Sequence, residues 1–374
     1  MANNNNTKNL NVPNLRFPEF KGEWEKKHLS ELVGDIKDRI STSSLSVDNY
    51  VSTENILQNF QGVTLATSLP HNTNVIAFRK DDILFSNIRP YLKKIWYASY
   101  DGGCSTDVFV FRNSGMCSAM FLYHLIANDK FINYVMLGTK GTKMPRGDKQ
   151  QIIQYVVYLP SKLEQNKIAT FLSLLDSRIE AQIKIIEKYE SLIKGIRYYI
   201  LEESTHYNYL GNLCDIIKGQ QVNLDNLLKH GRYYVMNGGT QPSGYYNSYN
   251  TNAGTISISE GGNSCGYVQY NKENFWSGGH CYTLQNIKGE LTEKYLYHYL
   301  KSNEKMIMAL RVGSGLPNIQ KKDLMSLRIP IPAKENQKKI SCLLDSIEDK
   351  ISVETNVMTK FMQQKQYLLA NLFI

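Results

Sequence analysis

A short segment in the first half of the chain alternates basic residues with aromatic ones. The segment covers residues 86–97 and reads SNIRPYLKKIWY. Basic side chains bind phosphate groups, whereas Asn87 and Arg89 also carry donors and acceptors that can read base edges. A solvated basic turn beside an edge strand would give the same pattern, and this alternative stays open. The candidate contacts of this segment are Asn87, Arg89, Tyr91, Lys93 and Lys94.

Two Gly-containing segments carry further basic residues. The first covers residues 138–149 and reads GTKGTKMPRGDK, and the second covers residues 313–322 and reads GSGLPNIQKK. A loop of this kind can grip phosphate groups with its cations. A simple turn that leads into a strand is the alternative interpretation. The candidate phosphate contacts are Lys140, Lys143, Arg146, Lys149, Lys321 and Lys322.

The second half of the chain has loops that are rich in Tyr, Asn, Gly and Ser rather than in charge. They cover residues 236–252 and 259–271. Such side chains form adaptable hydrogen bonds and stacking contacts, which suits base reading. They suit sugar binding or simple loop filling as well, and composition does not choose between these alternatives. The candidate contacts are Tyr245, Tyr246, Asn263 and Tyr267.

The motifs of several enzyme classes are missing from the sequence. Neither a phosphate-binding Gly-x-x-x-x-Gly-Lys-Ser/Thr nor a dinucleotide-binding Gly-x-Gly-x-x-Gly occurs. No two prolines are adjacent, which excludes the Asp/Asn-Pro-Pro-aromatic motif with which adenine methyltransferases hold a flipped base. The cysteines and histidines lack the spacing of a metal site. We therefore predict no catalytic residue, no metal and no cofactor in this chain, and we expect His124 and His298 to support helices.

Length and charge limit the class of protein. A chain of 374 residues is long enough for two or three domains. Its formal charge of +9 makes nucleic acid the first candidate partner and an anionic membrane the second. Scattered cysteines, no signal segment and no apolar run that could span a bilayer predict a cytoplasmic protein with reduced thiols.

One amphipathic segment occurs twice in the chain. EQNKIATFLSLLDSRI, residues 164–179, is echoed 172 positions later by NQKKISCLLDSIEDKI, residues 336–351. Such self-similarity indicates two copies of one structural unit. The same offset aligns Pro145 with Pro317 and Gly141 with Gly313, and a two-residue slip aligns His124 with His298.

Each copy ends in a long segment with apolar residues at alternating steps of four and three. This average of 3.5 residues is the period of a coiled-coil seam, whereas a helix on a globular core follows 3.6. A helix of about 40 residues is roughly 60 Å long, so much of its seam must find a partner beyond its own domain. The predicted seam comprises Ile168, Leu172, Leu175, Ile179, Gln182, Ile186, Ile340, Leu344, Ile347, Ile351, Glu354 and Met358.

Chain connectivity sets the direction in which these helices pair. The first helix leaves the first domain and enters the second, and the second helix starts there, so pairing along the seams must be antiparallel. Gln182 is then expected to face Glu354, and Ile374 is expected to lie near Trp24. The predicted fold class is α+β, with two pseudo-twofold-related α/β domains separated by an antiparallel two-helix coiled coil. The predicted parts are a flexible tail over 1–19, a first domain over 20–158, a central helix over 159–203, a second domain over 204–331 and a C-terminal helix over 332–374.

The string PSKLEQNKIATFLSLLDSRIEAQI, residues 160–183, closely resembles the specificity (S) subunit of type I restriction-modification enzymes. The second copy departs from the family pattern, with Asn336 in place of the glutamate. In the basic loop the first copy departs instead, with Arg146-Gly147-Asp148 where the second has Asn318-Ile319-Gln320.

The resemblance implies two target recognition domains, each reading one half of a split double-stranded DNA sequence. It implies helices that fix the spacer and dock two methyltransferase subunits, which would bring S-adenosylmethionine and methylate adenine N6. Restriction subunits would add ATP- and Mg-dependent translocation and cleavage. A free-standing DNA-acting enzyme, and a coiled-coil or carbohydrate-binding interaction protein, remain the alternatives.

Overall fold

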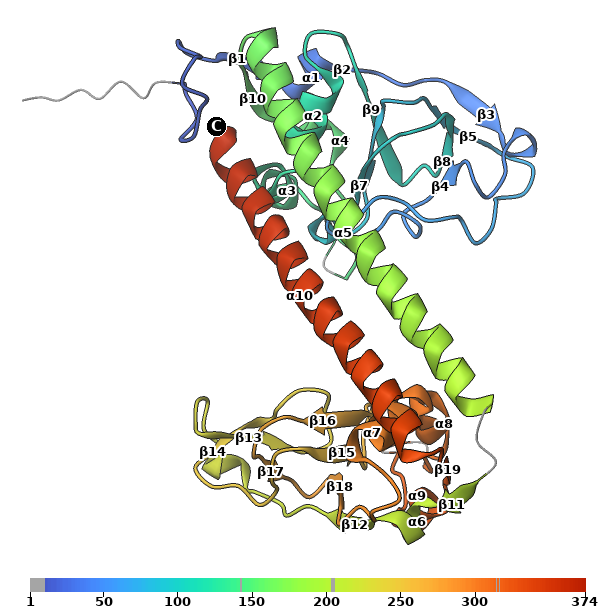
Figure 1. Cartoon of the computed structure of the whole chain (residues 1–374). Helices are drawn as coiled ribbons and strands as arrows, with labels where there is room; N and C mark the ends of the chain where they lie inside the picture. The colour runs from blue at the N-terminus through green and yellow to red at the C-terminus, as the bar shows by residue number, and fades with distance from the viewer. Residues whose placement is uncertain (1–10, 142, 203–205, 314, 316) are drawn as a thin grey trace, which may run out of the picture. The chain divides into compact units, whose positions relative to one another are not determined.

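The computed structural model describes residues 11–141, 143–202, 206–313, 315 and 317–374. The chain forms two compact units (Figure 1). The first comprises Met1–Gln182 with Val357–Ile374, and the second comprises Ile183–Asn356. Within the described residues, no helix is both long enough and apolar enough to cross a membrane.

The first unit contains two four-stranded sheets, ordered β2-β9-β6-β7 and β3-β5-β8-β4, and the pair β1-β10. Its strands are β1 (Glu25–His28), β2 (Val33–Gly34), β3 (Arg39–Ser41), β4 (Tyr50–Val51), β5 (Asn74–Phe78), β6 (Ile83–Ser86), β7 (Ile95–Tyr97), β8 (Gly102–Cys104), β9 (Val108–Asn113) and β10 (Val156–Leu159). Its short helices are α1 (Leu29–Leu32), α2 (Ala119–Ile126), α3 (Asp129–Leu137) and α4 (Lys149–Ile152), with 3-10 turns at Thr42–Ser44 and Pro90–Leu92.

Strand β6 lies between two cores, which explains its unbroken apolar run. Ile83 and Phe85 point into the core formed with α2, α3 and the long helices, whereas Leu84 points into a second core with Trp96 and Val108. A strand covered on both faces reads as continuous apolar residues rather than as an alternation. The end of β6 is therefore fixed from both sides, and the residues that follow it start from a rigid position.

The second unit contains the sheets β12-β18-β15-β16 and β14-β13-β17, and the pair β11-β19. Its strands are β11 (Tyr207–Tyr209), β12 (Asp215–Lys218), β13 (Tyr233–Met236), β14 (Gly244–Tyr246), β15 (Thr255–Ser259), β16 (Val268–Asn271), β17 (Trp276–Ser277), β18 (Cys281–Gln285) and β19 (Arg328–Pro330). Its short helices are α6 (Leu210–Leu213), α7 (Glu293–Ser302), α8 (Glu304–Ala309) and α9 (Lys321–Met325), with a 3-10 turn at Leu224–Asn226.

The two units repeat the same strand register. In the first unit Ile83 of β6 pairs with Phe111 of β9, and in the second Ile256 of β15 pairs with Leu284 of β18. Ile83 and Ile256 are 173 positions apart, and so are Phe111 and Leu284. This offset is one more than the offset of 172 between the long helices. The internal repeat in the sequence is therefore a repeat of structure, and the α+β fold class is confirmed.

Two long helices follow the strand pairs, α5 (Lys162–Glu202) and α10 (Lys334–Leu372). The repeated glutamine near each start has a structural role. Gln165 accepts a hydrogen bond from the Ser118 amide at 2.9 Å and donates to Pro160, while Gln337 accepts from the Thr292 amide at 2.8 Å and donates to Pro332. Each glutamine thus joins the start of a long helix to an otherwise unsatisfied amide at the start of α2 or α7.

The two histidines support helices, as the sequence predicts. His124 of α2 lies 3.3 Å from the Ser173 hydroxyl on α5, and His298 of α7 lies 3.0 Å from a carboxylate oxygen of Asp345 on α10. Burial, with a smaller effect of Lys365, lowers the pKa of His124 to about 3. The His124 imidazole is therefore neutral near pH 7 and acts as a packing and hydrogen-bonding group.

Every predicted seam residue is buried or half-buried. In the first unit, Leu172 and Leu175 share a core with Leu368 near the end of α10, and Lys365 forms an ion pair with Asp176. In the second unit, Ile193 near the end of α5 packs with Leu344 and Ile347 of the first half of α10. The early part of α5 thus meets the late part of α10 and the reverse, so the helices pair antiparallel. The pairing of Gln182 with Glu354 would join residues from different units and stays a prediction.

The start of the chain differs from the expected tail. Residues 11–19 are fixed to the first unit, because Arg16 is ion-paired with Glu164 and the amide of Leu15 donates to the carbonyl of Asn371. The end of the chain lies near Trp24, as expected: the rings of Trp24 and Phe373 both pack against Phe121. The remainder of the predicted tail, residues 1–10, lies outside the described residues.

Candidate DNA interface

The two basic segments of the first unit form one structure. The loop after β6 runs antiparallel to the Gly-containing loop, with Ile88 and Arg146 paired in a β-bridge. The amide of Arg89 donates to the Pro145 carbonyl at 2.8 Å, and the amide of Gly147 donates to the Asn87 carbonyl at 3.1 Å. We name residues 87–93 together with 138–149 the first paired loops.

The second unit builds the same arrangement at the corresponding positions. Gly261 and Asn318 form the β-bridge. The amide of Gly262 donates to the Pro317 carbonyl at 3.0 Å, and the amide of Ile319 donates to the Glu260 carbonyl at 2.9 Å. We name residues 260–264 together with 312–322 the second paired loops. The chain therefore presents one backbone scaffold twice, with different side chains on it.

Both Gly-containing loops close on themselves in the same way. Lys140 is bridged to Arg146 in the first unit, and Val312 is bridged to Asn318 in the second. The turn between each bridged pair includes a glycine with positive φ, 88° at Gly141 and 105° at Gly313. A residue with a Cβ would be strained there, which gives a physical reason for the repeated glycine.

Most cations of the first paired loops are exposed. Arg89 and Lys143 have no hydrogen-bond or ion-pair partner for their side chains among the residues that the structure describes. Lys140 is 3.0 Å from Asp148, whose pKa is lowered first by this contact and then by backbone amides. Exposed ion pairs of this kind contribute little to stability, so these lysines are free to exchange a carboxylate for a phosphate. The other exposed cations are Arg146, 3.4 Å from Asp107, and Lys149, 3.2 Å from Asp35.

Two candidates of the first segment are paired within the protein, and a third is buried. The ammonium of Lys93 is 2.6 Å from Asp129, and that of Lys94 donates to the Thr53 carbonyl at 2.5 Å. Burial lowers the pKa of Lys94. The side-chain oxygen of Asn87 is buried beside Gly147 and has no hydrogen-bond partner among the described residues. Arg89 and the half-exposed ring of Tyr91 are the side chains that this segment presents to solvent.

The candidates of the second unit lie in three different surroundings. Asn263 follows Gly262 on the second paired loops, and Lys321 and Lys322 begin α9 at their other end; all three are exposed. Tyr245 and Tyr246 belong to the separate β14-β13-β17 sheet, where the Tyr246 ring packs against Trp276. Tyr267 lies under the ammonium of Lys301 on α7, 4.0 Å from its ring centroid.

A buried carboxylate at the base of the second paired loops has no counterpart among the predicted site residues. Glu260 is 8% exposed and accepts from the Lys218 ammonium at 2.6 Å and from the Tyr282 hydroxyl at 3.0 Å. The His280 ring lies 3.6 Å from its other oxygen. Burial, and then Glu260, raises the pKa of Tyr282 to about 12, so its hydroxyl remains a donor. These side chains come from β12, the end of β15 and β18, and no spacing in the sequence brings them together.

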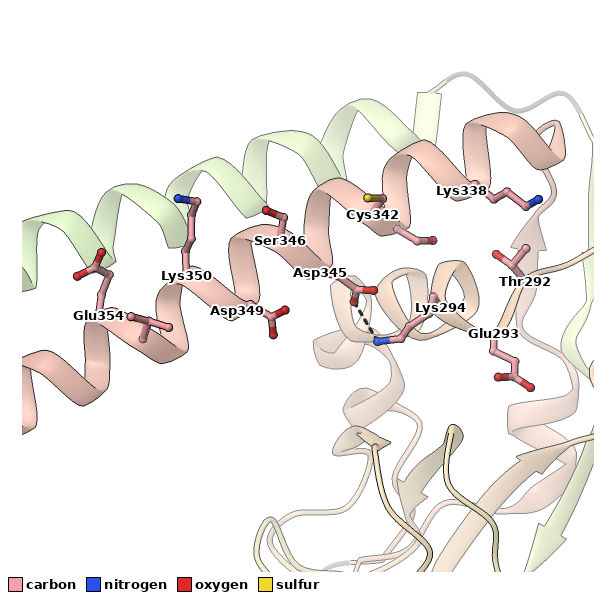
Figure 2. A pocket seen from close by; sticks show the side chains of 12 residues that line it. Thr292, Glu293, Lys294, Lys338, Cys342, Asp345, Ser346, Asp349, Lys350 and Glu354 are labelled. Atoms are coloured by element: carbon pink, nitrogen blue, oxygen red, sulfur yellow. Dashed lines mark hydrogen bonds and ion pairs between the residues drawn. The ribbon is translucent and has the colours of Figure 1, made fainter.

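A charged groove lies on the second unit, between the start of α7 and the first half of α10. Its volume is about 1020 Å³. Figure 2 shows that acidic and basic side chains from both helices line it, with Lys294 reaching Asp345 at 3.1 Å. Asp345 and Glu348 also lie close to His298, and side chains of these three types can bind a metal ion. Their contacts with one another form a polar connection between α7 and α10. The groove has the mixed charge of a protein-binding surface rather than the enclosed apolar form of a small-molecule site.

Comparison with known proteins identifies the family. A model of the type I restriction modification DNA specificity domain matches residues 21–188 and 206–360. A Mycoplasma genitalium protein named as a type I specificity subunit is 36% identical over 129 residues, 34% of this chain and 33% of that protein. A Mycoplasma pneumoniae protein with the same description is 38% identical over 123 residues, 33% of this chain and 32% of that protein. The matched stretch thus spans about a third of the length of each relative.

The fold is shared with solved structures. The crystal structure of a type I restriction-modification system S subunit from M. genitalium has a TM-score of 0.72 at 18% identity, covering 97% of this chain and 99% of that one. Because the family model matches the greater part of the chain, in two separate copies, this protein belongs to the type I restriction-modification DNA specificity family.

Proposed function

We propose that this chain is a DNA specificity subunit that binds a split double-stranded target, one half-site per unit. The observation that carries the proposal is the duplicated pair of loops. The same backbone hydrogen bonds hold them in both units, with Pro145 matched by Pro317, while Arg89 and Arg146 are replaced by Gly262 and Asn318. A common scaffold with different exposed side chains is what two readers of two different sequences require.

The charge of the first paired loops supports this proposal. Lys140, Lys143 and Arg146 are exposed, and phosphate contacts from such cations position a protein on a duplex. The second paired loops have Lys321 and Lys322 at the position that corresponds to Lys149 and its neighbour. Phosphate contacts are thus proposed for both units, with more of them in the first unit, and sequence-reading contacts are proposed among the residues that differ between the two loops.

The long helices support a second part of the proposal, a partner role. We propose that α5 and α10 fix the spacer between the half-sites and that two methyltransferase subunits dock on the helical part of the chain. The groove along α10 in Figure 2 is one candidate contact for such a subunit. One structural neighbour, with a TM-score of 0.50 at 21% identity, comes from a study of complex assembly in the type I R-M system.

Catalysis and its cofactors are proposed to belong to the partners. Methyltransferase subunits would bind S-adenosylmethionine and methylate adenine N6, and restriction subunits would use ATP and Mg. We propose a cytoplasmic location, where such a complex would meet the DNA. A free-standing enzyme is the competing proposal, and it requires activity from the chain alone.

A methylation assay tests the proposed function. The chain is purified alone, and also with the methyltransferase subunits encoded by the same restriction-modification system. Each preparation is incubated with genomic DNA and S-adenosylmethionine, and the methylated adenines are sequenced. We expect methylation only with the partners, and only at a sequence in two parts separated by a fixed spacer. Methylation by the chain alone, or an undivided target sequence, would contradict the proposal.

A further inference from the structure

Arg89 has a backbone conformation that favours glycine. Its φ of 51° and ψ of 62° lie in the left-handed region, which a residue with a Cβ occupies only at a cost in stability. The corresponding residue of the second paired loops is Gly262, with φ of 76°. The same hydrogen bond, to Pro145 or Pro317, holds each of them. The second copy therefore uses the unstrained residue at this position, and the first copy carries an arginine.

No intramolecular contact explains why the first copy has a side chain here. The Arg89 side chain is exposed and has no hydrogen-bond or ion-pair partner in the described part of the chain. A Cβ built on Gly262 meets nothing within 4 Å, so this position points into open space. Lys93, at the other end of the same turn, is also left-handed, with φ of 54°, but its ammonium is paired with Asp129 at 2.6 Å. The strained backbone of Arg89 is not offset by any side-chain contact within the described residues, which indicates that the side chain is kept for function.

The chemistry of the position selects a base over a phosphate. Phosphates are present in every sequence, so a phosphate contact needs an exposed charge but no fixed backbone conformation, whereas Arg89 is held in one. A residue that reads a base differs between half-sites, as Arg89 and Gly262 do. The planar guanidinium of arginine binds the O6 and N7 atoms of guanine through two parallel hydrogen bonds in the major groove.

We propose that Arg89 reads a guanine in the half-site bound by the first unit. This inference rests on the proposed function, and it adds one base and one residue to it. Lys140, Lys143 and Arg146 then hold the neighbouring phosphates, while the rigid turn fixes the direction of the Arg89 side chain. The second unit, with Gly262 at this position, makes no such contact.

The test compares Arg89→Gly with Arg89→Lys in the full chain assembled with its methyltransferase subunits. Binding to a library of oligonucleotides is measured by sequencing the bound fraction, and unfolding of each variant is followed by melting. We expect Arg89→Gly to raise the melting temperature by about 2–4 °C, because the strain is removed. It should also reduce discrimination at one G·C pair by about 10- to 100-fold. Arg89→Lys retains charge but not the two parallel donors, so it should lose the same discrimination.

Two control variants, Lys93→Gly and Gly262→Ala, separate the effect of backbone strain from the loss of the arginine side chain. Lys93→Gly relieves the same kind of strain but loses the ion pair with Asp129, so its melting temperature should rise less than that of Arg89→Gly. Gly262→Ala should lower the melting temperature and leave preference in the first half-site unchanged. Equal weakening by Arg89→Gly at every sequence, with recovery in Arg89→Lys, would make Arg89 a phosphate contact and overturn the inference.

The wild-type complex separates this inference from the proposed function. If the wild-type complex selects a split sequence and Arg89→Gly leaves every base preference unchanged, the inference on Arg89 is wrong and the proposed function stands. If the wild-type complex shows no sequence preference, the proposed function and the inference that rests on it are both overturned.

Discussion

Arg16 holds Glu164 through two hydrogen bonds, of 2.7 and 2.8 Å, at the first turn of α5. The Glu164 side chain is 1% exposed, so the arginine is the charge that compensates a buried carboxylate. The second copy has Asn336 at the corresponding position, which is neutral and needs no such partner. The early segment of the chain is thus fixed to the first unit by a charge pair that the repeat does not share.

We predict that Arg16→Ala destabilises the first unit by about 3–5 kcal/mol, because it leaves a buried charge uncompensated. Glu164→Asn in the same chain, which copies the second unit, should recover a large part of that loss. Urea unfolding of the two single variants and the double variant measures the effect. Additive losses in the double variant would contradict the role of the pair.

The pKa of His124 gives a prediction about acid stability. Its pKa of about 3 in the folded protein is below the value near 6.5 of an unfolded chain. The unfolded state therefore binds more protons between these values, so stability is full above pH 6.5 and falls as the pH is lowered toward 3. Between these two pKa values, we expect this histidine to lower the free energy of unfolding by about 1.4 kcal/mol for each pH unit of acidification.

The variant His124→Asn isolates this contribution. Urea unfolding between pH 7.5 and 4.5 should show a smaller loss of stability in the variant than in the unmodified protein. Other titrating groups contribute equally to both proteins, so only the difference between the two curves is interpreted. Parallel curves would mean that His124 keeps an ordinary pKa in the fold.

The sequence predicted the helices better than it predicted the contacts of the loops. The 3.5-residue period fixed the buried face of α5 and α10, because a long helix repeats one local geometry and burial follows spacing. Which loop side chains are exposed depends instead on hydrogen bonds between distant segments. The Asn87 side-chain oxygen is buried beside Gly147, and the Thr53 carbonyl holds the Lys94 ammonium, although Asn87 and Lys94 belong to the same basic-aromatic pattern.

The residues of the Glu260 cluster are brought together only by the fold. Lys218 lies on β12, Glu260 directly follows β15 and Tyr282 lies on β18, and no local pattern relates them. One sequence feature points to the paired loops: the glycines and prolines of the two Gly-containing loops match at an offset of 172. These glycines and prolines mark a repeat in the sequence. The segment that pairs with each Gly-containing loop is set instead by the order of strands in the sheet.

Lys143→Ala should weaken DNA binding at every sequence. Its ammonium is exposed on the first paired loops and is proposed to contact a phosphate. The slope of log K against log salt should fall by about 0.9, the value for one phosphate contact. Binding at four salt concentrations measures it. Lys94→Ala is the matched comparison: it should change the slope less, because its ammonium donates to Thr53. A larger change of slope for Lys94→Ala would reverse this assignment.

The continuous helix α5 predicts an effect on the spacer. Four residues inserted near Lys188 add about 6 Å along the helix. Against a DNA rise near 3.4 Å per base pair, the spacer between half-sites should lengthen by about one or two base pairs. Sequencing of methylated sites reports the spacer directly. An unchanged spacer would mean that the helices do not set the distance.

The central claim is that the paired loops read the two halves of the target separately. The most direct measurement is methylome sequencing of cells that carry the methyltransferase subunits with a chain in which residues 87–91 and 138–146 are replaced by residues 260–264 and 310–318. We predict a change in one half of the recognised sequence, with the other half and the spacer retained. A change in both halves, or no change in a folded and methylating complex, would contradict it.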